Sequence, residues 1–212
     1  MDRSINAIPR CARNASFADR VAPARRGLLA CLAALAIAGA ATPVHAAEIE
    51  GVEFAEQVTT GDLELKLHGV GLLKYMVFVK AYVAGLYLGP GCTAENVLAD
   101  APKRLEISYF WDIAREDFIS VTRTAIQQNL TEAEFASLRD QVEQFVNLYQ
   151  AVTPGDRYSL TYVPGVGTEL ALNGTALGVI EGAELGAAVF AIWFGDAEID
   201  GKLKAALLAS AG

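Results

Sequence analysis

The chain has 212 residues, of which 53% are hydrophobic, and its formal net charge at pH 7 is −8. Nucleic acids and anionic membrane surfaces select for clustered Lys and Arg, so an acidic chain of this kind argues against both as partners.

The first 46 residues have the features of an export signal. Arg25 and Arg26 end a basic segment, residues 28–41 form an apolar run, and Val44 and Ala46 occupy the positions that a signal peptidase reads. We predict cleavage after Ala46 and a periplasmic protein. The run is shorter than the roughly 20 apolar residues of a membrane span, so we expect no stable span.

The sequence is consistent with two export routes. Arg25, Arg26 and the leucines that follow resemble a twin-arginine signal, which is an alternative to the general route. A lipoprotein box is disfavoured, because Cys31 precedes most of the apolar run instead of following it. The basic segment is also unusually long, which leaves a later translation start near Val21 as an alternative.

Removing residues 1–46 leaves 11 basic and 23 acidic residues, a formal net charge of −12. Cys92 and His68 are the remaining cysteine and histidine, so an internal disulfide is impossible. Metal centres and nucleophile triads mostly need more of these residues, and we expect no metal and no cofactor. The length that remains suffices for one domain over residues 47–212.

The start of this domain consists of consecutive strand patterns, which favours antiparallel pairing. Gly69 and Gly71 are interpreted as the end of the second strand. In the third strand, alternation places Phe78, Lys80 and Tyr82 on one face of a segment that is apolar on both faces. We therefore expect the ammonium and the phenol to sit in, or at the mouth of, an apolar space. Strands are predicted at 52–58, 63–70, 77–88 and 104–110, with a short helical piece at 93–98.

The hydrophobic period then changes from 2 to 3.6, which predicts helices. Thr131 and Glu134 have the spacing of a capping box at the start of the second helix. Asn173 and Gly174 are a strong signal for a tight hairpin turn. Helices are predicted at 115–129, from 131 onward, at 184–194 (apolar nearly all round, hence packed on two sides) and at 200–208, with strands at 158–163, 169–172 and 175–180.

These patterns predict one α+β domain with a curved antiparallel sheet and helices on one face. The order and spacing of several segments resemble the bacterial exported branch of the chalcone isomerase-like family. The resemblance covers most of residues 48–208 and implies an open-faced β-sandwich, in which a large antiparallel sheet and a layer of helices enclose an apolar cleft. It rests on residues 69–88, 103–117, 144–162, 164–168, 173–174, 192–195 and 203–207.

Plant enzymes of this family close a flavanone ring. An arginine stabilises the substrate oxyanion, while threonine, tyrosine and asparagine side chains bind substrate or order a water. The resemblance places these four positions at Leu73, Tyr82, Phe118 and Ala125, so all four differ here, and only Thr175 matches a late cleft threonine. Without the cation, a developing phenolate loses most of its electrostatic stabilisation, so we expect no efficient chalcone cyclisation.

A second branch of the family binds fatty acids without catalysis, through an arginine and a tyrosine on the carboxylate. The resemblance places that tyrosine at Tyr82 and that arginine at Leu73, and Lys74 or Lys80 would supply the missing charge as a weaker point contact. The alternative is that Lys80 extends out of the sheet edge and Tyr82 is a satisfied core phenol. The predicted ligand-binding residues are Tyr82, Lys80, Lys74, Leu73, Phe78, Phe118, Ala125 and Thr175.

Three hypotheses for function follow. The favoured one is a non-catalytic protein that binds an apolar or amphipathic, fatty-acid-like small molecule. The others are an isomerase of the intramolecular lyase type with a divergent site, and an interaction module whose cleft is filled by its own side chains. Cleft volume separates the third from the first two, and a proton-transferring group within reach of the ligand separates an enzyme from a binding protein.

Overall fold

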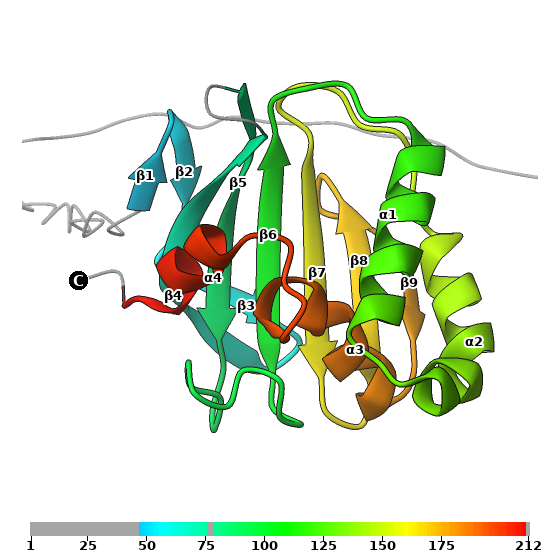
Figure 1. The fold of residues 1–212 in the computed structure, drawn as a ribbon. Coiled ribbons are helices and arrows are strands. Elements are labelled where there is room, and N and C mark those ends of the chain that lie inside the picture. The colour runs from blue at the N-terminus through cyan, green and yellow to red at the C-terminus, as the bar shows by residue number, and fades with distance from the viewer. Residues whose placement is uncertain (1–46, 76–78, 211–212) are drawn as a thin grey trace, which may run out of the picture. The chain divides into compact units, whose positions relative to one another are not determined.

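The computed structural model describes residues 47–75 and 79–210, and the predicted signal peptide lies outside this part. Its main feature is a curled seven-stranded sheet in which each strand pairs antiparallel with its neighbours in the chain (Figure 1). The strands are β3 (Gln57–Thr60), β4 (Leu63–Tyr75), β5 (Val79–Leu88), β6 (Lys103–Tyr109), β7 (Arg157–Val163), β8 (Gly167–Leu172) and β9 (Thr175–Ile180).

Four helices lie on one face of this sheet (Figure 1). Helix α4 packs on β4, α2 packs on β9, and α3 contacts α1, α2, α4 and β8. These contacts bury nine residues of α3, which confirms its predicted packing on two sides. The predicted α+β class is confirmed as well. The helices are α1 (Arg115–Gln128), α2 (Glu132–Val146), α3 (Ala183–Phe194) and α4 (Gly201–Leu208).

No helix in the described part of the chain combines the length and the apolar character that crossing a membrane requires.

Two local signals in the sequence are confirmed by the geometry. The Thr131 hydroxyl accepts a hydrogen bond from the backbone N–H of Glu134, while the Glu134 carboxylate accepts one from the backbone N–H of Thr131. Asn173 and Gly174 both have positive φ, 51° and 79°, as a tight hairpin turn between β8 and β9 requires. Short-range hydrogen bonding and backbone conformation decide both features.

The predicted strand at 52–58 is wrong in part. The structure divides it between β2 (Val52–Phe54) and β3, and β2 pairs with an additional strand, β1 (Ala47–Ile49). Phe54 packs on Val83 and Tyr87, on the sheet face opposite the helices. Strand β5 is therefore covered on both faces, as its apolar sequence predicts.

Gly69 and Gly71 do not end a strand, because β4 continues through both to Tyr75. They permit a close approach instead. A Cβ at Gly69 would overlap the carbonyl oxygen of Leu207, and one at Gly71 would lie 2.7 Å from Leu203 Cδ1. Both glycines thus let α4 lie directly on the strand.

Residues 93–98 form turns instead of the predicted helical piece. The Asn96 side chain accepts a hydrogen bond of 2.6 Å from the Thr93 N–H and donates one of 3.1 Å to the Gly91 carbonyl. Asparagine competes in this way with helical backbone hydrogen bonds.

Candidate functional site

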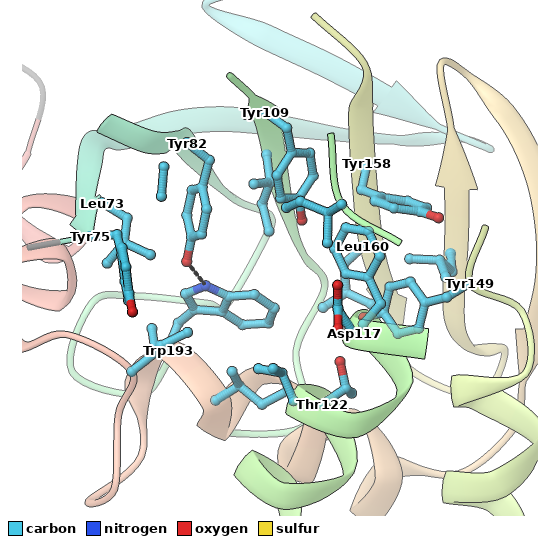
Figure 2. A pocket seen from close by; sticks show the side chains of 18 residues that line it. Leu73, Tyr75, Tyr82, Tyr109, Asp117, Thr122, Tyr149, Tyr158, Leu160 and Trp193 are labelled. Carbon is cyan, nitrogen blue, oxygen red and sulfur yellow. Dashed lines mark hydrogen bonds between the residues drawn. The ribbon is translucent and has the colours of Figure 1, made fainter. Parts of the chain in front are cut away.

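A cavity of about 330 Å³ lies between the sheet and helices α1 and α3. Strands β4 to β8 form one wall, the two helices form the other, and loop residues complete it (Figure 2). Almost all of the lining is hydrocarbon or aromatic. The volume of the cavity shows that the protein's own side chains do not fill the cleft. The lining residues are Leu73, Tyr75, Ala81, Tyr82, Ile107, Tyr109, Ile113, Asp117, Phe118, Val121, Thr122, Tyr149, Tyr158, Leu160, Leu170, Ile192, Trp193 and Ile199.

A β-bulge between β4 and β5 decides which side chains enter the cavity. Leu73 pairs with Tyr82, but the next pair is Lys74 with Lys80, so Ala81 is an extra residue on β5. Ala81 and Tyr82 both line the cavity. The bulge breaks the strict alternation on which the predicted shared face of Lys80 and Tyr82 depends, and that prediction is wrong.

Lys80 is engaged on the other side of the strand. Its ammonium forms an ion pair with Glu50, which belongs to the turn between β1 and β2. Its backbone carbonyl accepts a hydrogen bond of 2.7 Å from the Trp111 indole N–H. The Lys80 side chain is half exposed and does not line the cavity.

Tyr82 and Trp193 form one end of the cavity. The Trp193 Nε1–H donates a hydrogen bond of 3.0 Å to the Tyr82 hydroxyl, and both side chains are buried (Figure 2). Burial raises the pKa of the Tyr82 phenol well above its ordinary value, against a smaller lowering by this hydrogen bond. Tyr82 therefore stays protonated at neutral pH and keeps a hydrogen to donate.

An aromatic cluster continues the cavity wall from Tyr82, whose ring meets that of Tyr109 on the next strand. Phe118 stacks on Tyr149 at 5.1 Å between ring centroids and meets Tyr109 and Tyr158 edge-on. The Tyr158 hydroxyl donates to the Gln150 carbonyl at 2.9 Å and accepts from the Gln150 N–H at 2.8 Å, which fixes its ring. Such aromatic contacts hold the wall in one arrangement.

Two further phenols in this cluster are deeply buried. Burial raises the pKa of Tyr149 to about 12, with a smaller lowering from the Thr122 hydroxyl. Burial also raises the pKa of Tyr109 well above its ordinary value. The Tyr109 hydroxyl points into the cavity (Figure 2), and within the described residues no group forms a hydrogen bond with it.

The mouth of the cavity is apolar. Tyr75, Val121 and Ile199 line it, although 67%, 54% and 42% of their surfaces are exposed. Asp117, also exposed, contributes a carboxylate from the first turn of α1. Large exposed apolar side chains gathered around an opening are typical of a binding surface.

The lining carries little charge. Of the 18 residues that line the cavity in the described part of the chain, Asp117 is acidic and none is basic. Lys74, the alternative cation suggested by the resemblance, is exposed on β4 and does not belong to the lining. The described residues also contain no group of His, Cys, Asp and Glu side chains that could hold a metal ion.

The structure brings together three of the predicted site residues, Leu73, Tyr82 and Phe118. Ala125 packs in the neighbouring core of α1, and Thr175 is exposed at the start of β9, so neither lines the cavity. Phe78 lies outside the described residues.

Sequence reasoning missed Trp193, Tyr109 and Tyr149. Each lies in an apolar stretch of the sequence, where an aromatic side chain is ordinarily part of the core. The signal available was chemical, because a phenol or indole N–H in such a stripe needs a hydrogen-bond partner.

Comparisons with known proteins agree with this fold. No curated protein matches the sequence. Among solved structures, the fold is similar to an Arabidopsis thaliana fatty-acid binding protein, with a TM-score of 0.63 and 14% sequence identity, covering 77% of this chain and 96% of that one. A likeness at this identity shows the fold.

The family model described as chalcone isomerase-like matches residues 46–209, which include every strand and helix described above. The chain belongs to the chalcone isomerase-like family.

Proposed function

We propose that this protein binds a small apolar or amphipathic molecule, of fatty-acid-like character, in the cavity between the sheet and α1 and α3, without catalysing a reaction. The observation that carries the proposal is the cavity itself. Its volume of about 330 Å³ falls at the lower end of the range for ligand pockets, and its wall is apolar with a few convergent hydroxyls. The fatty-acid binding activity named for the similar Arabidopsis protein supports the same class of ligand.

The chemistry of the lining supports binding over catalysis. General acid–base catalysis works best with a group whose pKa lies near the operating pH. Burial raises the pKa of Tyr82, Tyr109 and Tyr149 away from that range. Chalcone cyclisation needs a cation for the developing oxyanion, and Leu73 stands beside Tyr82 where the resemblance places the arginine.

We further propose that residues 1–46 direct the chain to the periplasm and are removed there. The family match begins at residue 46, which supports a boundary near the predicted cleavage site. Intact mass measurement on protein from a periplasmic fraction tests this point, with a mature chain that starts at Ala47 as the expected result. A full-length chain retained in the cytoplasm would overturn it.

Tryptophan fluorescence offers a direct test of binding. The chain has two tryptophans, and the Trp111→Phe variant leaves Trp193, in the cavity wall, as the reporter. Titration with the uncharged fluorophore N-phenyl-1-naphthylamine should quench Trp193 in a saturable way and transfer energy to the bound dye.

Cavity-filling variants make this test specific. Ala81→Phe and Leu170→Phe each add a ring to the cavity wall from a different strand, and both should abolish dye uptake. Ala133→Phe adds the same ring at an exposed position of α2 and should leave uptake unchanged. Equal uptake by all three variants would refute the proposed site, and failure of the parent protein to take up dye would refute the function.

A further inference from the structure

The polar groups of the cavity are arranged to donate hydrogen bonds. The Tyr82 hydroxyl already accepts from Trp193, which leaves its own hydrogen for another partner. The Tyr109 hydroxyl comes from the adjacent strand, and the two rings meet edge-on at 5.6 Å. Within the described residues, no acceptor forms a hydrogen bond with either hydroxyl. Buried donors of this kind ordinarily have a partner.

Both hydroxyl groups belong to side chains that lie deep in the protein. Tyr82 is 7% exposed and Tyr109 is 6% exposed, and both line the cavity. An acceptor oxygen on a ligand in the cavity would give these donors a partner. A buried donor without an acceptor is costly, and this is the physical reason for expecting such an oxygen.

A carboxylate is a poor candidate for this acceptor. The end of the cavity formed by Tyr82 and Trp193, here called the inner end, has no cation among the described residues that line it. A buried anion without a counter-charge has a large desolvation penalty. The same desolvation raises the pKa of the phenols that would surround it. A carboxylic acid would therefore enter this end in its protonated form.

The mouth disfavours the opposite orientation. A carboxylate left at the opening would lie beside the carboxylate of Asp117 and the apolar side chains of Tyr75, Val121 and Ile199. Like charges repel, and none of these rim residues offers a counter-charge. The same rim can cover an aliphatic tail that leaves the cavity.

We propose that the cavity takes an uncharged amphiphile, an aliphatic ketone, aldehyde or ester, whose carbonyl oxygen accepts hydrogen bonds from Tyr82 and Tyr109 while its chain extends past the apolar mouth. This inference rests on the binding function proposed above and names the chemical class of its ligand.

Three probes of equal carbon number test the inference: undecan-2-one, undecanoic acid and undecane. Each competes with N-phenyl-1-naphthylamine at pH 8, below its solubility limit. The ketone should bind about tenfold more tightly than undecane, as one or two hydrogen bonds to buried donors allow, and at least about tenfold more tightly than undecanoate.

The dependence on pH separates the two forms of the acid. The ketone should bind equally at pH 8 and pH 6. Undecanoic acid must take up a proton to enter, so its apparent affinity should rise about tenfold for each unit that the pH falls. An affinity of the acid that does not depend on pH, at the level of the ketone, would overturn the inference while leaving the binding function intact.

Matched variants show which tyrosine hydroxyl donates a hydrogen bond to the ketone. Tyr109→Phe should lower the affinity for the ketone about fivefold to tenfold and leave the affinity for undecane unchanged. Tyr87→Phe makes the same chemical change on the opposite face of β5 and should affect neither probe. If Tyr109→Phe lowers the affinities for the ketone and for undecane equally, this result would contradict a hydrogen bond to the carbonyl. Failure of all three probes and of the dye to bind the parent protein would overturn both the inference and the binding function.

Discussion

The Trp193 indole N–H donates a hydrogen bond of 3.0 Å to the Tyr82 hydroxyl, between side chains 111 residues apart in the chain. This bond joins α3 to β5 at one end of the cavity. Because the indole can only donate, it uses the Tyr82 oxygen as an acceptor and leaves the phenolic hydrogen to point elsewhere. A contact that stabilises the fold thereby also sets which hydrogen-bonding groups the cavity presents.

Removing the Tyr82 hydroxyl should destabilise the protein. Tyr82→Phe leaves the buried Trp193 N–H without its acceptor, and we expect the free energy of unfolding to fall by about 1–3 kcal/mol. Urea denaturation followed by circular dichroism measures this change.

Tyr87→Phe is the matched control on the same strand. The Tyr87 hydroxyl is buried without a hydrogen-bond partner in the described part of the protein, so its removal should raise the free energy of unfolding by about 1 kcal/mol. A loss of stability of the same size in both variants would show that the Tyr82 hydroxyl makes no specific contribution.

Leu73→Arg should convert the ligand preference of the cavity. Leu73 lines the cavity and pairs with Tyr82 across the two strands, so an arginine there places a guanidinium beside the phenol. We expect undecanoate at pH 8 to bind at least about tenfold more tightly to this variant than to the parent.

Leu72→Arg adds the same charge one residue earlier, where the side chain packs toward the opposite sheet face. It should leave undecanoate binding unchanged. If both variants improve binding equally, the gain comes from overall charge and not from the cavity.

Gly69→Ala should displace α4. The added Cβ would overlap backbone carbonyl oxygens of α4, which cannot rotate away as a side chain can. We expect the free energy of unfolding to fall by at least about 2 kcal/mol, in the range measured for overpacked sites. Gly201→Ala is the control, because its Cβ would meet only the mobile end of Glu198, and it should be neutral or stabilising. An unchanged midpoint for Gly69→Ala would contradict the close contact of α4 with β4.

The buried phenols predict a loss of stability at alkaline pH. Burial raises the pKa of Tyr82, Tyr109 and Tyr149, in the last case to about 12. The folded state therefore retains these protons where the unfolded chain, with tyrosine pKa values of about 10, has released them. The contribution of these phenols to the free energy of unfolding is complete below pH 10 and declines as the pH rises toward 12.

Urea midpoints measured at pH 8, 10 and 11 test this dependence. The contribution of the tyrosines to stability should be nearly constant between pH 8 and pH 10 and lower at pH 11. Tyr149→Phe should show a shallower decline between pH 10 and pH 11, because one titrating phenol is gone. An identical decline in parent and variant would assign the effect to other groups.

Sequence reasoning predicts local structure well here, where short-range interactions decide it. The capping box of Thr131 and Glu134 and the turn at Asn173 and Gly174 depend on residues that adjoin one another in the chain. Amphipathic periods likewise locate α1 and α2, since the buried stripe of each helix is continuous in sequence. Together with strand alternation, these signals suffice for the fold class.

The site was less predictable because tertiary packing determines it. The bulge at Ala81 moves Lys80 away from Tyr82, and no local residue pattern marks it. Gly69 and Gly71 resemble a strand end until the position of α4 is known. Trp193 meets Tyr82 only after α3 has packed on the sheet, so the hydrogen bond that defines the inner end has no signature in the sequence.

Native mass spectrometry of the protein recovered under mild conditions from its own cell envelope tests the central claim most directly. We expect a bound small molecule that collisional activation releases, and its loss in the Ala81→Phe variant, with the Ala133→Phe control still loaded. Recovery of the parent protein without added mass, together with no uptake of N-phenyl-1-naphthylamine, would contradict a ligand-binding function for this cavity.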